Sequence, residues 1–383
     1  MIRIAFLINF KAKSWIGGYN FIINLIDSLR FLNSKKIQPV LIVGKKFNTK
    51  NLKNNNLEII KTNLFNENLP KKIFNKFLIF LFGKSYIYEK FFKKKRIDVF
   101  SHSQIPLGKK SNIKSFPWIT DFQYLHYPEN FSLKNRILKT INVKFLGIHS
   151  NQIILSSKNA KKDLKKISLN AHNKSTVNSF VFNLISQKKI ININALMKKY
   201  KLSEKFFYLP NQYFVHKNHI VVLKALNHIL KTKKFKKFEI VSTGHNVDHR
   251  DLGHFKKIKN YIYKNNLKKN YIYLGVIPYN DMMSLMYHSI AVLNPSKFEG
   301  WSSSVEQAKS MGKKVILSNI QVHKEQNPER AKYFNANNSL ELSKILIKEW
   351  LVFNKNLEKR KTKASYRNLK KRLSIFANNY IKI

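Results

Sequence analysis

The chain opens with an apolar run that is followed by helical spacing, and this order recurs along its first half. Apolar residues fill most of positions 2–9, and between 19 and 32 they return at the spacing of one helix face. Further runs typical of buried strands stand at 39–43, 97–101, 118–122 and 153–157, the last leading into a lysine-rich helical segment from residue 159. The alternation of strands and helices predicts a parallel α/β sheet.

The same alternation resumes in the second half. Strands are predicted at 206–210, 238–243, 271–275, 290–293 and 314–318, with helices at 218–231 and 279–288. Between the halves, the Lys/Asn-rich stretch 186–205 carries few large apolar residues in register and is predicted to be a linker. A chain of 383 residues fits two such domains. We place them at 1–202 and 203–356, followed by a basic helical segment at 357–383.

Basic residues dominate the charge of the chain. Lysine and arginine number 72 against 20 aspartates and glutamates, a formal net charge of +52. That charge suits nucleic acid or an anionic membrane. However, Lys, Asn, Ile and Phe are all in excess, as an AT-rich genome would produce in any protein. We therefore give the total charge little weight and look at where it concentrates.

Two absences narrow the class of protein. The chain has no cysteine, which excludes disulfides and thiolate metal sites and is typical of a reducing compartment. No apolar run approaches the roughly 20 residues of a membrane-spanning helix, and the first run is too short for a signal peptide. A cytoplasmic protein is expected.

The segment 71–95 differs in kind from the rest of the first half. It holds thirteen large apolar residues, eight of them aromatic, with lysines at both ends and between them. An aromatic face bordered by lysine is typical of a helix that lies on an anionic membrane. A core helix with solvated lysines has the same pattern, so both interpretations stay open.

The turn at 294–302 is the strongest candidate for a binding site. It follows a predicted strand and precedes a short helix that Gly312 ends, so Glu299 and Glu306 stand near the carboxyl end of a parallel strand, where α/β sheets bind ligands. Paired carboxylates also serve in glycoside hydrolysis. Glu306, however, falls in the first helical turn, where backbone amides favour a phosphate and a carboxylate can accept ribose hydroxyls.

The same residues allow a purely structural interpretation. Ser303 and Glu306 have the spacing of a capping box, in which Ser303 is the N-cap and Glu306 bonds back to its amide. Spacing alone favours this cap over a ligand-binding role.

Three further groups carry candidate chemistry. Lys217, in a His-Lys-Asn-His run before a helix, suits a diphosphate. The two histidines of that run lack the third ligand that a metal site requires. Gly17 and Gly18 precede the first helix, where they would allow either a close ligand approach or a plain tight turn. His126 stands before a Tyr-Pro step and is either a cleft histidine or a packed one.

Taken together, these stretches resemble the retaining glycosyltransferases of the family 4 type, in the subgroup with a Phe-Glu-Gly-Trp-Ser motif. The resemblance rests on residues 120–129, 209–219, 298–308, 312–318 and 322–328. It spans most of the chain and is weakest at 45–115 and after 340. It implies an α/β fold of the GT-B architecture, in which two Rossmann-like domains face each other across a cleft. By resemblance, the first domain binds the acceptor, the second binds the nucleotide-sugar, and the last helix crosses back onto the first.

The resemblance also implies roles for particular residues. His126 and Glu299 are the implied catalytic residues. The implied nucleotide-sugar ligands are Gly17, Gly18, Lys217, Gly300, Trp301, Ser302, Ser303 and Glu306. No metal and no other cofactor is implied. Two departures are present: the two glutamates are closer by one residue than in most members, and Gln212 stands where many members have an arginine.

We therefore expect a hexosyl-type transferase of cell-surface polysaccharide biosynthesis, such as that of O-antigen, capsule or lipopolysaccharide. Its partners would be a nucleotide-sugar, a glycan or lipid-linked acceptor and, through 71–95, the inner face of the plasma membrane. Two alternatives stay open. One is a basic nucleic-acid-binding protein, which we do not favour, and the other is a GT-B protein that has lost catalysis and binds glycans.

Overall fold

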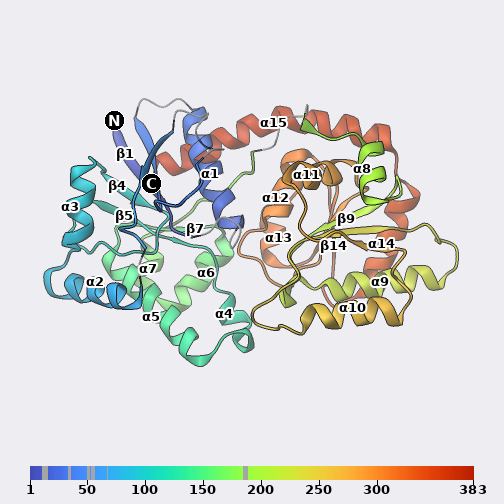
Figure 1. The fold of residues 1–383 in the computed structure, drawn as a ribbon, viewed down its shortest axis with the longest axis horizontal. Helices are drawn as coiled ribbons and strands as arrows, with labels where there is room; N and C mark the ends of the chain where they lie inside the picture. Colours follow the sequence, from blue (N-terminus) through green and yellow to red (C-terminus); the bar gives the residue numbers. More distant parts are fainter. Residues whose placement is uncertain (11–15, 33–35, 50–51, 53–56, 67, 184–188) are drawn as a thin grey trace. The chain divides into compact units, whose positions relative to one another are not determined.

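The computed structural model describes residues 1–10, 16–32, 36–49, 52, 57–66, 68–183 and 189–383. They fall into two compact units (Figure 1). Unit 1 comprises Met1–Val181 and Arg372–Ile383, and unit 2 comprises Phe182–Lys371. The chain thus divides at 181 and 182, whereas the sequence pattern places the boundary at 202 and 203.

Unit 1 is built on parallel strands. Its larger sheet has the order β3-β2-β1-β4-β5 and its smaller one the order β6-β7-β8. These strands are β1 (Ile2–Ile8), β2 (Ile37–Val43), β3 (Glu58–Lys61), β4 (Val99–Ser101), β5 (Lys114–Phe116), β6 (Trp118–Ile119), β7 (Ile153–Leu155) and β8 (Ser175–Val177). The central strand β1 is buried from Ile4 to Ile8. A parallel strand covered on both faces is apolar without alternation, which explains the uninterrupted run at the start of the sequence.

The helices of unit 1 follow its strands in the chain. They are α1 (Ile16–Phe31), α2 (Leu69–Phe82), α3 (Tyr86–Lys94), α4 (Gln123–His126), α5 (Leu133–His149), α6 (Lys158–Ile167) and α7 (Leu169–Asn173). The last helix of the chain, α15 (Lys355–Ile381), ends in this unit. There Phe376 and Tyr380 are buried, and the Tyr380 hydroxyl donates to Ser101 Oγ at 2.7 Å.

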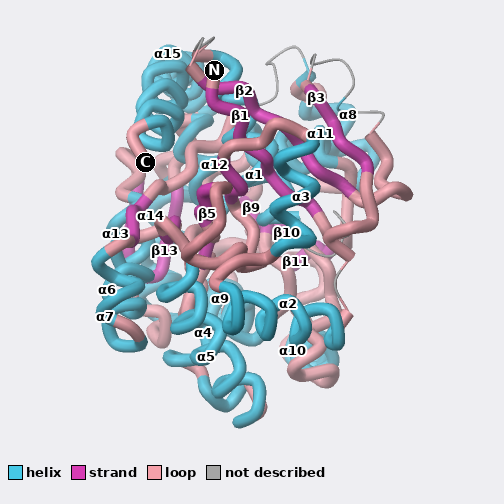
Figure 2. Tube along the Cα trace, turned by 90° about the vertical axis from the view of Figure 1, so that its left-hand side faces the viewer, coloured by secondary structure: helices cyan, strands magenta, loops and turns pink. Residues whose placement is uncertain are grey.

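Unit 2 contains one sheet with the order β11-β10-β9-β12-β13-β14, and every strand pair in it is parallel. The strands are β9 (Phe207–Pro210), β10 (Ile240–Thr243), β11 (Tyr271–Tyr273), β12 (Val292–Asn294), β13 (Val315–Ser318) and β14 (Ala331–Phe334). The helices are α8 (Ile193–Tyr200), α9 (His219–Lys231), α10 (His254–Lys264), α11 (Tyr279–His288), α12 (Ser303–Met311), α13 (Gln321–Gln326) and α14 (Ser339–Leu351). Figure 2 shows the helices (cyan) and strands (magenta) from a second side. In this doubly wound order the chain direction across the sheet reverses between β9 and β12, where such folds bind ligands.

Two sequence predictions are wrong. The linker at 186–205 contains helix α8, whose Ile193 and Leu196 are buried, although its residues 186–188 lie outside the described part. The segment 71–95 is two helices rather than one, because Gly83 ends α2 in the left-handed conformation at φ 74°. The helical segment predicted at 357–383 is confirmed, because it lies in the single helix α15. For the linker and for 71–95, the positions of apolar residues alone did not fix where a helix begins or ends.

Within the described residues, no helix combines the length and the apolar character that crossing a membrane requires.

The end of helix α12 gives a test of the fold. Gly312 has φ 70°, and a Cβ built on it would lie 1.8 Å from Ser365 Oγ. We expect Gly312→Ala to lower the free energy of unfolding by about 2 kcal/mol or more, through backbone strain plus the clash. Urea denaturation measures the change.

Gly275 is the matched control, because its φ is 69° and the nearest atom to an added Cβ is 3.9 Å away. Gly275→Ala should cost about 1 kcal/mol, the strain alone. Equal costs for the two variants would show that Ser365 does not restrict position 312.

Candidate functional site

The ends of β9 and β12 bring two loops together at the reversal point of the unit 2 sheet. Asn218 Nδ2 donates to the backbone oxygen of Pro295 at 3.1 Å, and the Lys297 amide donates to the His216 oxygen at 2.8 Å. Two stretches that are about 80 residues apart in sequence therefore form one surface at the carboxyl end of the strands.

An ion pair joins the two loops. Lys217 Nζ donates to both oxygens of Glu299, at 2.7 and 2.8 Å. Glu299 is only 8% exposed, and its Oε1 also accepts from Ser296 Oγ at 2.7 Å. Burial acts to raise the pKa of Glu299, but the Lys217 ammonium outweighs it and the pKa is lowered from 4.5 to about 2. The carboxylate is therefore charged at neutral pH, and Lys217 is its counter-ion.

Glu306 lies in the first turn of α12, as predicted, but it is not part of the predicted capping box. The N-cap is Ser302 rather than Ser303, and its side chain does not cap the helix. Instead, Asn294 Nδ2 donates to Ser302 Oγ at 2.7 Å, so that a residue of β12 takes the oxygen a cap would use. Glu306 is 1% exposed, and Gln326 Nε2 lies 3.5 Å from its Oε2.

Gln326 is a residue that the sequence analysis did not single out. Its amide group brackets Ser302, accepting from the Ser302 amide at 3.3 Å and donating to the Ser302 oxygen at 3.0 Å. Gly300 and Trp301 lie half-buried in the same loop. The signal was present, because Gln326 belongs to one of the stretches that carry the family resemblance.

Several buried polar atoms near the ion pair have no partner. Among the residues that the structure describes, Asn211 Nδ2, His216 Nδ1 and His323 Nε2 lack a hydrogen bond. Burial lowers the pKa of His216 to about 3, so its ring is neutral. A group of unpaired buried polar atoms is unusual in a folded protein and is expected where a ligand or water binds.

The remaining predicted residues lie in unit 1. Gly17 and Gly18 are in the first turn of α1, not in the preceding loop as the sequence predicted. His126 ends α4, and its Nε2 is 2.7 Å from Asp163 Oδ2 of α6. Asp163 is buried and also accepts from Lys166 Nζ at 3.2 Å. The carboxylate fixes one nitrogen of the His126 ring, whose side chain remains 36% exposed.

His102 was also missed by the sequence analysis. It follows β4, which neighbours β1 at the reversal point of the unit 1 sheet, and it adopts φ 56° although it is not a glycine. Its Nδ1 lies 2.9 Å from Ser101 Oγ, and burial lowers its pKa to about 3. Strain of this kind often marks a functional position. A histidine directly after a buried strand was the available signal.

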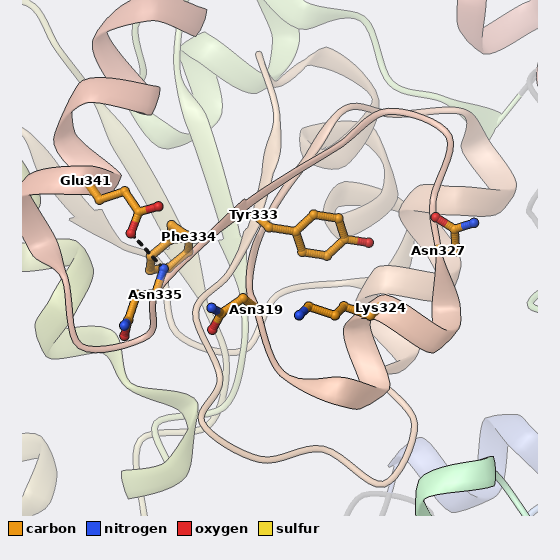
Figure 3. Close-up of a pocket in the computed structure, with 7 residues that line it drawn as sticks. All are labelled: Asn319, Lys324, Asn327, Tyr333, Phe334, Asn335 and Glu341. Atoms are coloured by element: carbon orange, nitrogen blue, oxygen red, sulfur yellow. Dashed lines mark hydrogen bonds between the residues drawn. The ribbon is translucent and has the colours of Figure 1, made fainter.

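The described residues form no metal-binding group, and the best-defined hollow lies away from the predicted site residues. Within the described ranges, no three side chains of His, Cys, Asp or Glu stand together as metal ligands. An open hollow of about 460 Å³ lies beside β13 and β14 (Figure 3), lined by Asn319, Lys324, Asn327, Tyr333, Phe334, Asn335 and Glu341. The Asn335 amide donates to Glu341 there at 2.9 Å. The hollow contains none of the predicted site residues.

A comparison with protein families covers the unit that holds the ion pair. Residues 192–367 match the family described as "Glycosyl transferases group 1". The match lies within unit 2. A comparison with curated protein sequences gives no match.

Several solved structures match the whole chain or nearly all of it, and glycosyltransferases are among them. HepE of Anabaena, solved with UDP and glucose, is 14% identical with a TM-score of 0.70, covering 100% of this chain and 99% of that one. A glycosyltransferase of Rickettsia africae is 16% identical with a TM-score of 0.66, covering 100% and 97%. WaaG, a glycosyltransferase of lipopolysaccharide biosynthesis, is 11% identical with a TM-score of 0.62, covering 98% and 95%. At such identities the likeness shows the fold, and the predicted α/β class with two Rossmann-like domains is confirmed.

The lowered pKa of Glu299 predicts a pH dependence. Because the folded-state pKa is about 2 against an ordinary 4.5, the stabilisation is complete above pH 4.5 and is lost as the pH falls towards 2. We expect the stability difference between the wild type and Glu299→Gln to shrink over this window. Urea denaturation at a series of pH values measures it, with the exposed Glu329→Gln as the control. A difference that stays constant with pH would show that Lys217 does not lower the pKa of Glu299.

Proposed function

We propose that the protein transfers a sugar from a nucleotide-sugar to a glycan or lipid-linked acceptor, with retention of the anomeric configuration. The observation that carries the proposal is the buried Lys217–Glu299 pair beside the first turn of α12, at the reversal point of a glycosyl transferase group 1 domain. Retention, the family 4 type and the Phe-Glu-Gly-Trp-Ser subgroup come from the resemblance of the site residues.

The roles of the unit 2 residues follow from their chemistry. Lys217 neutralises the diphosphate, aided by the amides at the start of α12, which Ser302 leaves without a side-chain cap. Glu306 accepts the ribose hydroxyls, and Glu299 accepts a hydroxyl of the sugar. In the free protein these charges satisfy each other, so nucleotide-sugar binding exchanges the Glu299 contact of Lys217 for a phosphate. The neighbouring Gly300, Trp301 and serines 302 and 303 complete the pocket.

In unit 1, the proposal gives His126 a catalytic role near the reacting sugar. Asp163 holds one ring nitrogen, which fixes the orientation of the ring. The amides of Gly17 and Gly18, in the first turn of α1, would face the diphosphate. Catalysis then consists of orienting the reactants and stabilising the leaving diphosphate, with no metal or other cofactor in the proposed scheme.

The comparisons suggest which substrates to test first. HepE was solved with UDP-glucose, which favours a UDP-hexose as the first candidate. WaaG and the galactosyltransferase WaaB act in lipopolysaccharide biosynthesis or its outer core, which favours a cell-surface polysaccharide. We therefore propose a place on the cytoplasmic side of the plasma membrane, where such acceptors are assembled.

Glu306→Gln tests the nucleotide site. The change replaces the charged carboxylate with a neutral amide of nearly the same shape. The fold should therefore persist while ribose binding weakens. We expect the thermal shift by UDP or a UDP-sugar to require about tenfold more ligand, the cost of about one charged hydrogen bond.

The matched control is Glu329→Gln, which changes an exposed glutamate of the same unit. A panel of GDP-, ADP- and dTDP-sugars covers other bases. Equal ligand requirement for both variants would remove the ribose role. If no nucleotide-sugar shifts the wild type, the transferase proposal fails.

His126→Asn tests the catalytic role in unit 1. We expect kcat for transfer or nucleotide-sugar hydrolysis to fall by about a hundredfold or more, a usual loss for a positioned catalytic group. The thermal shift by the nucleotide should stay as in the wild type. His172→Asn, on α7 of the same unit, is the control. Unchanged kcat in His126→Asn would contradict the assignment.

A further inference from the structure

Helix α2 exposes apolar side chains where a helix of a globular protein normally carries polar ones. Phe74, Phe77, Phe80 and Leu81 recur at helical spacing, and each is exposed, Phe80 by 79%. Among the side chains of α2 whose burial the structure describes, Ile79 is the large apolar one that is buried. An apolar stripe that faces outward points to a partner or a membrane.

Helix α5 repeats this arrangement. Leu133, Ile137 and Ile141 follow each other at intervals of four residues, and all are at least half exposed, as is Leu138. The buried residues of α5 are Val143, Leu146 and Gly147. The sequence analysis made no prediction for this face of α5.

The two helices are neighbours. Lys76 Nζ of α2 donates to Asn142 Oδ1 of α5 at 3.2 Å and lies 5.2 Å from the centre of the Phe145 ring. Lys76 directly precedes Phe77, and Phe145 lies one turn after Ile141, on the same stripe. The contact therefore stands at the edge of both apolar faces and makes them one surface, which we call the α2/α5 face.

The charges of the α2/α5 face have one sign. Neither helix contains an aspartate or glutamate. The basic residues are Lys71, Lys72 and Lys76 on α2 and Lys134, Arg136, Lys139 and Lys144 on α5. A second copy of this chain would place these cations against each other. An anionic surface with an apolar interior complements both properties.

We propose that the α2/α5 face docks onto an anionic lipid bilayer, with the exposed aromatic and aliphatic side chains at the level of the acyl-chain boundary and the lysines among the headgroups. Amphipathic helices bind membranes in this way when apolar burial and attraction to anionic lipid add together. The inference extends the membrane interpretation of 71–95 to α5. It does not depend on the proposed transfer reaction, because binding is measured without substrate.

Site-specific labelling gives a direct test, since the chain has no cysteine of its own. Phe80→Cys and Ile141→Cys are labelled with an environment-sensitive fluorophore and mixed with vesicles of phosphatidylglycerol and phosphatidylcholine. Both labels should shift to shorter wavelength and be quenched by a bilayer-embedded quencher. Tyr263→Cys is the control, because Tyr263 is 81% exposed on helix α10 and lies outside the face.

Vesicle sedimentation then distinguishes insertion of the α2/α5 face into the bilayer from electrostatic attraction of the whole basic protein to the vesicles. We expect the double variant Phe77→Ser/Phe80→Ser to bind vesicles with a partition constant about tenfold lower or more, because less apolar surface is buried in the bilayer. Tyr263→Ser should bind as the wild type. Circular dichroism and thermal unfolding check that the variants fold.

The outcomes are distinct. Insertion of both labels together with weaker binding of the double serine variant supports the proposal. Equal sedimentation of wild type and variant, with no label shift, would mean that the net charge alone attracts the protein and would overturn it. Concentration-dependent dimerisation that the serine changes abolish, without vesicle binding, would also overturn it and assign the face to a second copy.

Discussion

The candidate site depends on the way Glu299 is held. A carboxylate buried to this extent is stable in the charged state only with a counter-ion and hydrogen bonds, and Lys217 and Ser296 supply them. Lys217 comes from the loop after β9, whereas Glu299 comes from the loop after β12. The pair therefore fixes two loops against each other at the reversal point of the sheet. Removing either charge would leave the other without its counter-ion.

This arrangement also determines how α12 begins. Asn294, at the end of β12, donates to Ser302 Oγ at 2.7 Å and lies 3.4 Å from Glu299 Oε1. The side-chain oxygen of Ser302 thus accepts from Asn294 and does not cap the first helix amides. Gln326 holds the backbone of the same serine from the other side. The helix start is positioned by loop contacts, which is the arrangement that an incoming anion requires of it.

The sequence predicted the elements of this site better than their connections. The apolar runs located β9 and β12, and the spacing placed Glu306 in the first helical turn, because these are local properties. The capping box was wrong because the N-cap is Ser302 rather than Ser303. Asn294 and Gln326 position Ser302, and spacing within the helix does not reveal these contacts. The partnership of His126 with Asp163 spans 37 residues and depends on how two helices pack. Asp163 is the single acidic residue of α6, which was the available hint.

The role of the aromatic segment 71–95 depends on which of its side chains are exposed. Phe92 on α3 is fully buried, whereas Phe77 on α2 is 54% exposed, although both stand in the same lysine-rich stretch. The core-helix interpretation holds for α3, whose Phe92 is buried. The membrane interpretation stays a proposal for α2, which presents its apolar stripe outward. A general bias towards lysine and phenylalanine accounts for the number of these residues. It does not account for a stripe of them on one side of α2, next to a second such stripe on α5, with no acidic residue on either helix.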